Sequence, residues 1–214
     1  MVGAVIAFDH VALSAGSLTL GGQAFASATG LVLPTGGKHP LMGTHNCVSA
    51  MGPDTFLELI AIDPDAEAPG RPRWFGLDDM AASAPLHARA LLYRTDDIAG
   101  ALDVARDLDV DLGTPVALSR GAMTWSFSVR GDGAVPLGGV GPMLLQWDSP
   151  EPHPASAMQD LGIRLVGTRV TTPDPAPLER LFTAWAPDTV PDISQGRAAL
   201  TVTLALPDGR EVTL

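Results

Sequence analysis

Residues 36–63 read GGKHPLMGTHNCVSAMGPDTFLELIAID, and this stretch is the most informative part of the sequence. Its second half has the composition of a core strand but carries one carboxylate, Glu58, and its first half sets His39 among glycines. An apolar run near the start of the chain, residues 7–14, carries His10 in the same way. Polar and charged side chains rarely enter a core unless they are paired or bind a metal. His10 and Glu58 are therefore the first candidates for chemistry.

Strand alternation predicts that both side chains lie on faces that are otherwise largely apolar. Successive residues of a strand point to opposite sides, so we expect Phe8 to share a face with His10, and Phe56 to share a face with Glu58. A neutral imidazole and a carboxylate together suit Zn, Fe, Mn or Ni. A buried His–Glu hydrogen bond, or a position at a surface edge, explains the same pattern without a metal. The residues alone leave these alternatives open.

The composition is that of a globular protein, since 46% of the 214 residues are hydrophobic and 17% are charged. The single cysteine, Cys47, excludes an internal disulfide framework, and the N-terminus lacks the basic start of a signal peptide. We therefore expect a cytoplasmic protein. A net charge of −11 argues against nucleic acid and anionic membranes as partners, because both bind basic surfaces. No apolar run reaches the length of a membrane span.

The order strand, helix and then several strands recurs along the chain. Two such modules are expected over about residues 5–63 and 85–149, and a shorter pass of strand, helix and hairpin follows. The pattern predicts an α+β fold with a main domain over residues 1–158 and a βαββ extension over residues 159–214.

Three helices are expected from their terminal residues. Ser17 is placed to cap a first helix, which ends near Gly30. Residues 95–97, Thr-Asp-Asp, open a second helix that runs to about residue 108. A third helix, residues 175–185, has prolines in its first turn.

Five separated motifs resemble the glyoxalase-like domain family of the vicinal oxygen chelate superfamily, which also contains bleomycin-resistance proteins and dioxygenases. They are FDHVALSAGSL, GGKHPLMGTHN, TFLELIAID, RPRWFGLDD and MLLQW, and the second and third are the most specific. The resemblance covers roughly residues 8–154. It implies paired βαβββ modules that form a curved, barrel-like mixed sheet around a central cavity. The C-terminal extension then either completes the sheet or mediates formation of a homodimer.

The resemblance also implies a set of metal ligands, because metal-dependent members take them from the first and last strand of each module. By position these are His10 and Glu58 in the first module and Gln146 in the second. The fourth position falls near Ala88 or Ala90, so one expected ligand is missing. Three protein ligands and a water still suit a catalytic divalent metal such as Zn, Fe, Mn or Ni. A metal-free cavity that binds an organic ligand is the alternative.

Further residues of the second motif resemble family positions at the cavity mouth. His39 is a candidate general acid or base beside Glu58, since its ordinary pKa lies near neutrality. A histidine that binds a loop backbone is the alternative for His39. Thr44 and Asn46 are candidates for substrate binding, although Asn46 also suits a strand end.

Aromatic residues and one arginine complete the candidate site. Trp74 and Trp125 suit the wall of a pocket for an apolar or planar ligand. Arg73, in the segment between the modules, is a candidate anchor for a carboxylate, with a surface ion pair as the alternative. His153 resembles another recurring family histidine but has no assigned role.

Two functions are compatible with these residues. The first is a small-molecule enzyme of lyase, isomerase or dioxygenase type, in which a metal would act as a Lewis acid on vicinal substrate oxygens. The second is a non-catalytic protein that sequesters a hydrophobic or aromatic compound. The first requires His10, Glu58 and His39, whereas the second requires only the cavity and its aromatic walls.

Overall fold

The computed structural model describes residues 4–149 and 151–214 and contains two modules with the same order of elements. The first module comprises β1 (Ile6–Ser14), α1 (Leu18–Thr29), β2 (Thr35–His39), β3 (Thr44–Ala50) and β4 (Phe56–Ile62). The second comprises β5 (His87–Thr95), α2 (Ile98–Asp107), β6 (Thr114–Arg120), β7 (Met123–Val129) and β8 (Met143–Trp147). Short helices occupy the connections: η1 (Pro40–Met42), η2 (Trp74–Asp79), α3 (Pro136–Gly139) and η3 (Pro154–Ala157). The expectation of paired βαβββ modules is confirmed.

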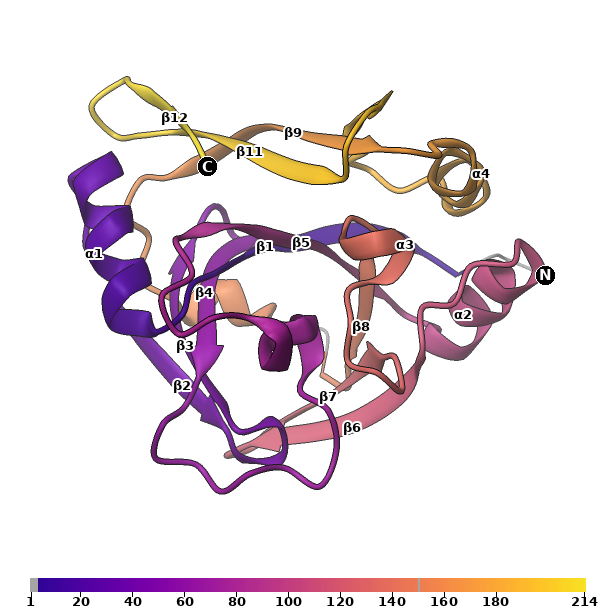
Figure 1. Ribbon diagram of the computed structural model, residues 1–214, viewed down its shortest axis with the longest axis horizontal. Helices are drawn as coiled ribbons and strands as arrows, with labels where there is room; N and C mark the ends of the chain where they lie inside the picture. Colours follow the sequence, from indigo (N-terminus) through magenta and orange to yellow (C-terminus); the bar gives the residue numbers. More distant parts are fainter. Residues whose placement is uncertain (1–3, 150) are drawn as a thin grey trace.

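The eight strands of the modules form one mixed sheet in the order β2-β3-β4-β1-β5-β8-β7-β6. β1 pairs with β4 in parallel and with β5 antiparallel, so the modules join through their first strands. The sheet curls until its outer strands, β2 and β6, approach each other in the lower part of Figure 1. This is the barrel-like sheet with a central cavity that the resemblance implies.

The main helices begin where local sequence predicts. Ser17 caps α1 by accepting a hydrogen bond from the Leu20 backbone at 3.2 Å, and Gly30 ends the helix with a left-handed φ of 76°. Asp97 caps α2 in the same way, accepting from the Gly100 backbone at 2.9 Å. These side chains satisfy backbone donors that a helix leaves without partners.

β1 departs from regular alternation at Asp9. The register between β1 and β5 shifts between Phe8 and His10, which marks a β-bulge. Phe8 therefore packs with Val11 in the core outside the barrel, whereas His10 lines the cavity inside it. The expectation that Phe8 and His10 share a face is wrong, because the bulge interrupts the alternation between them.

A C-terminal extension covers one side of the barrel. It comprises β9 (Arg164–Thr172), α4 (Ala176–Trp185), β10 (Asp192–Gln195), β11 (Ala199–Ala205) and β12 (Glu211–Thr213). Its strands form a second sheet in the order β10-β9-β11-β12, which lies above β1 and β5 in Figure 1. Inner residues of the extension, such as Leu181 and Val202, share one core with Val11 and Leu91 of the barrel. The division into two domains after residue 158 stays a prediction.

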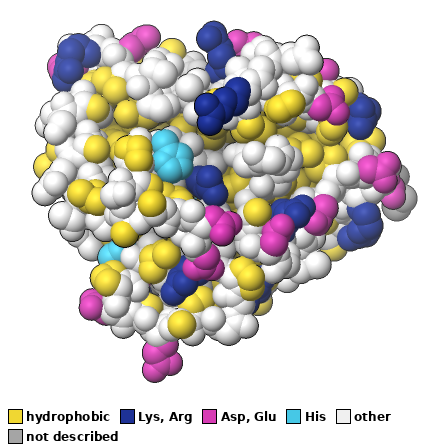
Figure 2. Space-filling model, viewed as in Figure 1, with side chains coloured by type: hydrophobic (Ala, Val, Ile, Leu, Met, Phe, Trp, Pro, Cys, Tyr) yellow, Lys and Arg dark blue, Asp and Glu magenta, His cyan; other side chains and the backbone are white. Residues whose placement is uncertain are grey.

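The exterior of the protein carries mixed charge. Acidic and basic side chains are interspersed on the face drawn in Figure 2. Each helix within residues 4–149 and 151–214 is too short or too polar to cross a lipid bilayer.

Candidate functional site

A cavity lies inside the barrel, between the two modules. Its volume is about 50 Å³, room for a few water molecules. Its walls are mostly apolar and rich in aromatic rings, and its polar lining groups include a carboxylate, two imidazoles and a guanidinium. The aromatic walls are Phe56, Trp74, Phe75, Trp125, Phe127 and Trp147, and the polar groups include His10, His39, Asn46, Glu58 and Arg120.

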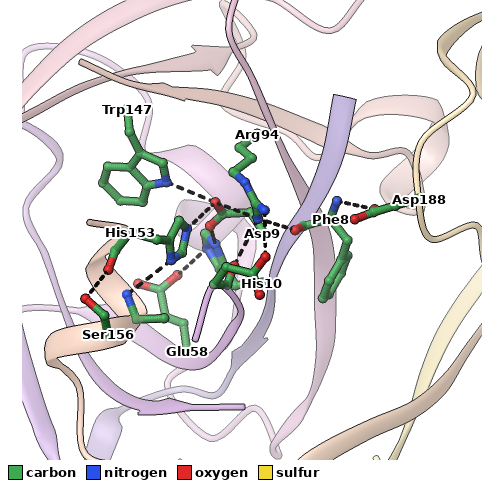
Figure 3. Close-up of polar contacts among 11 residues, drawn as sticks. Phe8, Asp9, His10, Glu58, Arg94, Trp147, His153, Ser156 and Asp188 are labelled. Atoms are coloured by element: carbon green, nitrogen blue, oxygen red, sulfur yellow. Dashed lines mark hydrogen bonds and ion pairs between the residues drawn. The ribbon is translucent and has the colours of Figure 1, made fainter. Parts of the chain in front are cut away.

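His10 and Glu58 meet at one side of the cavity. His10 Nε2 lies 3.5 Å from Glu58 Oε2, and both side chains are buried. The other ring nitrogen of His10, Nδ1, lies 2.6 Å from Asp9 Oδ1 (Figure 3). The ring also stacks on Phe56, with ring centroids 4.0 Å apart. Its orientation is therefore fixed from two sides.

The charges of this cluster depend on one another. Burial disfavours the imidazolium of His10, but the carboxylates of Asp9 and Glu58 outweigh burial and raise the pKa of His10. Burial also opposes ionisation of Glu58, yet His10 and Asn46 lower the pKa of this carboxyl below its ordinary value. These shifts favour a buried imidazolium between the two carboxylates.

Asp9 is buried completely and accepts hydrogen bonds from three side chains. Besides His10, Trp147 Nε1 donates to Asp9 Oδ2 at 2.9 Å, and His153 Nε2 lies 2.9 Å from the same oxygen (Figure 3). His153 Nδ1 accepts from the Ala155 backbone at 3.2 Å, so the ring proton is on Nε2 and is donated to Asp9. Burial would raise the pKa of Asp9, but these histidines hold it well below its usual range.

Asn46 orients Glu58 from the first module. Asn46 Nδ2 donates to Glu58 Oε1 at 2.6 Å, and Asn46 Oδ1 accepts from the Gly37 backbone at 2.7 Å. A Cβ at Gly36 would lie only 2.2 Å from Asn46 Oδ1. The glycines of the second motif therefore let β2 approach the amide that holds Glu58.

His39 is a neutral histidine across the cavity. Its Nδ1 lies 3.1 Å from Thr44 Oγ1, which also accepts from Trp74 Nε1 at 3.2 Å. Because the Trp74 indole only donates, the Thr44 hydroxyl can give its own proton to His39 Nδ1. Burial, with a further contribution from the charge of Arg120, lowers the pKa of His39 to about 4. His39 is thus uncharged at neutral pH.

Most of the residues that sequence analysis singled out come together. His10, His39, Asn46, Glu58, Trp74 and Trp125 line the cavity, and Thr44 lies buried behind His39. Arg73 does not line it. It pairs with Asp78, with 2.6 Å between Nη1 and Oδ1.

Gln146 is also separated from His10 and Glu58. Its Oε1 accepts from the Ile98 backbone at 2.9 Å, at the start of α2. In β8, Leu145 and Trp147 line the cavity, so alternation turns Gln146 to the outer face. The position that corresponds to Glu58 inside the barrel is apolar.

The donor set does not fit a divalent metal. His10 and Glu58 supply two ligand atoms from the first module, but the second module turns Leu92 and Leu145 to the interior. Among the described residues, no group of three or more His, Cys, Asp or Glu side chains is arranged to hold a metal ion. Protein sites for the metals considered above use at least three protein ligands.

Sequence reasoning missed three residues of the site: Asp9, Trp147 and Arg120. The sequence did contain a signal for Asp9, because this carboxylate stands next to His10 in an otherwise apolar strand. Trp147 ends the fifth motif, where an aromatic side chain equally suits ordinary core packing, and only the structure shows that it donates to Asp9. Arg120 is far from every motif, and only folding brings it to the cavity.

Comparisons with known proteins agree with this architecture. The family model of the glyoxalase-like domain matches residues 8–186. A hypothetical protein from Staphylococcus aureus has a TM-score of 0.62 and 13% identity, and the match covers 98% of each chain. Methylmalonyl-CoA epimerase from Mycobacterium tuberculosis has a TM-score of 0.42 and 18% identity over 66% of this chain and 86% of that chain. The match to the Staphylococcus aureus protein shows the fold alone, and the match to the epimerase is too distant to support an inference. Comparison with curated proteins found no significant match.

Proposed function

Because the chain belongs to the glyoxalase-like domain family, we propose that it is a small-molecule enzyme of isomerase or lyase type that moves a proton within the cavity. The observation that carries this proposal is the buried chain Asp9–His10–Glu58, which opens onto the cavity. The dioxygenase type is less well supported, because the donor set does not fit a metal.

The burial of Asp9, His10 and Glu58 favours a catalytic role for these side chains over a purely structural one. Each ionised group costs free energy when it leaves water, and a well-packed apolar residue would often stabilise the fold as well. Clusters of titratable groups with perturbed pKa values in a cavity are typical of active sites. The aromatic walls exclude water from the same place, which strengthens the electrostatic interactions there.

Each residue has a distinct role in the proposed reaction. Glu58, ionised at neutral pH, takes a proton from a substrate carbon next to a carbonyl group. The electron pair moves onto the carbonyl oxygen, which accepts a hydrogen bond from neutral His39. Protonated His10 balances the charge beside Glu58. Return of the proton to a second position gives the isomerase, and loss of a leaving group gives the lyase.

A substrate enters only if the cavity opens. The volume of about 50 Å³ is smaller than the roughly 150 Å³ of a cavity that binds a molecule the size of benzene. Met123 and Met158 line the cavity together with Pro154. Methionine side chains are flexible, so they are the groups we expect to move first.

Proton exchange in D₂O tests the proposal. Phenylpyruvate and 4-phenyl-2-butanone are incubated with the protein, and NMR follows loss of the proton signal next to the carbonyl. We expect exchange above the spontaneous rate, and a loss of about 100-fold or more in E58Q. E211Q, which changes an exposed glutamate of β12, is the matched control.

The outcomes separate the two functions. E58Q with an unchanged exchange rate, or a folded wild-type protein without exchange for either compound, would contradict the enzyme. Binding of such compounds by the wild type without exchange would instead favour the sequestration protein. Thermal unfolding of each variant shows whether the fold is retained.

A further inference from the structure

One side chain of the cavity has no role in the chemistry above: Arg120, the last residue of β6. It is the only lysine or arginine among the described residues that line the cavity. Several arginines outside the cavity are held by carboxylates, as Arg94 is by Asp54 and Arg130 by Asp111. Within residues 4–149 and 151–214, Arg120 has no ion pair or side-chain hydrogen bond of its own. The carboxylate that lines the cavity, Glu58, pairs with His10 and Asn46, so the partly exposed guanidinium of Arg120 is left without an anionic partner there among the described residues.

The position of Arg120 is set by the other module. A Cβ at Gly37 would lie 2.5 Å from Arg120 Nη1 and 2.8 Å from its Cδ. The side chain therefore crosses from the edge strand β6 and rests on the backbone of the opposite edge strand, β2. The Gly37 amide also donates to Asn46, which holds Glu58. Two residues, Gly37 and Asn46, thus connect Arg120 to the proposed base.

We propose that Arg120 anchors the carboxylate of a small acid whose apolar or aromatic body lies against the tryptophans of the cavity. This inference rests on the proposed function, for which it names the substrate class. A guanidinium pairs with a carboxylate through two parallel hydrogen bonds. Trp74, Trp125 and Trp147 provide the apolar walls for the rest of the molecule.

The charges in the cavity favour a carboxylate over a phosphate. Arg120 supplies one positive charge, and the charge of His10 is already shared by Asp9 and Glu58. A phosphate dianion would leave a second negative charge without a partner near Glu58. A monoanion is matched by Arg120 alone.

Binding is tested with a pair of probes that differ only in charge. Phenylacetate and phenylacetamide are titrated against the protein, and binding is followed through the fluorescence of the cavity tryptophans. We expect phenylacetate to bind about tenfold or more tightly than the amide. R120Q is expected to remove this preference, whereas R106Q, which changes an exposed arginine of α2, is expected to keep it.

G37A tests the position of the guanidinium without changing its charge. The new Cβ would displace the flexible end of Arg120, so the preference for phenylacetate should fall while binding of the amide stays the same. This variant separates an anchored carboxylate from a general attraction of anions.

Three results would overturn the proposal. They are equal binding of phenylacetate and phenylacetamide, retention of the preference in R120Q, and absence of saturable phenylacetate binding. Tighter binding of phenyl phosphate than of phenylacetate would also overturn it, because the site would then select phosphate. E58Q keeps the two proposals apart, since it should lose proton exchange but bind phenylacetate at least as tightly as the wild type.

Discussion

The carboxylate of Asp9 organises the site at the scale of single residues. His10, Trp147 and His153 all donate to it, and these donors come from both modules and from the segment after β8. Since Asp9 accepts from His10 Nδ1, His10 Nε2 faces Glu58 and the cavity. Asp9 is not among the described residues that line the cavity, so we infer that it positions His10 and does not react itself.

The pH dependence of stability reports on His10. Its pKa is raised in the folded chain, so protonated His10 stabilises the fold below its ordinary pKa of 6.5. This contribution is lost as the pH rises through the raised pKa. We therefore expect the difference in unfolding free energy between the wild type and H10Q to shrink as the pH rises above about 6.5. Urea unfolding at a series of pH values measures it.

Asp9 and Glu58 set the acid limit of this measurement. Their pKa values are lowered in the folded chain, so their contribution is present above the ordinary carboxyl values and is lost as the pH falls through the lowered ones. The series therefore stays above about pH 5. If the difference in unfolding free energy between the wild type and H10Q stayed constant or grew with pH, His10 would not be protonated between the two carboxylates.

At the scale of elements, local sequence signals were sufficient to predict where two helices begin. They were insufficient to predict which way certain side chains of β1 and β8 point. Ser17 and Asp97 cap their helices through contacts within one turn, which a sequence displays directly. The bulge at Asp9 depends on the pairing of β1 with β5, which lies far along the chain. In β8, residues 143–145 are apolar on both faces, so the pattern did not show that Gln146 points outward.

Helix α1 offers a test of how closely it packs on the sheet. Its adjacent glycines differ in surroundings: a Cβ at Gly21 would lie 2.8 Å from Leu59 Cδ1 and 2.9 Å from Ala15 Cβ, whereas a Cβ at Gly22 meets nothing within 4 Å. We expect G21A to lower the unfolding free energy by about 1–3 kcal/mol through overpacking. G22A, the matched control, should raise it by about 0.5–1 kcal/mol, because alanine favours the helix.

Urea unfolding of both variants measures these changes. If G21A were as stable as G22A, the helix would have room to move away from β4. The close approach of α1 to the sheet would then not constrain the position of Glu58 on the same strand.

At the scale of the whole molecule, the protein has two hydrophobic cores, and one of them joins the C-terminal extension to the barrel. The outer core joins β1 and β5 of the barrel to α4 and β11, and the inner core surrounds the cavity. Asp188, after α4, accepts from the Phe8 backbone at 2.7 Å, directly beside the bulge that positions Asp9. The resemblance gave the barrel, but the motifs that carry it end near residue 154, so nothing in them indicated this contact.

We therefore expect the barrel and the extension to unfold as one unit. Val202 in β11 is fully buried against the barrel, whereas Val166 in β9 is 52% exposed. V202A should lower the unfolding free energy by about 2 kcal/mol, and V166A, the matched control, by less than about 0.5 kcal/mol. In a W185F background, fluorescence reports only the three tryptophans of the cavity, and circular dichroism reports both sheets.

Coincident transitions by the two probes, both shifted by V202A, would show cooperative unfolding. A fluorescence transition that V202A leaves in place, while circular dichroism shifts, would mean that the extension unfolds first and that the barrel stands alone. The site would in that case persist without the Asp188 contact. Proton exchange by the partly unfolded protein would then measure how much the extension contributes to the geometry of His10 and Glu58.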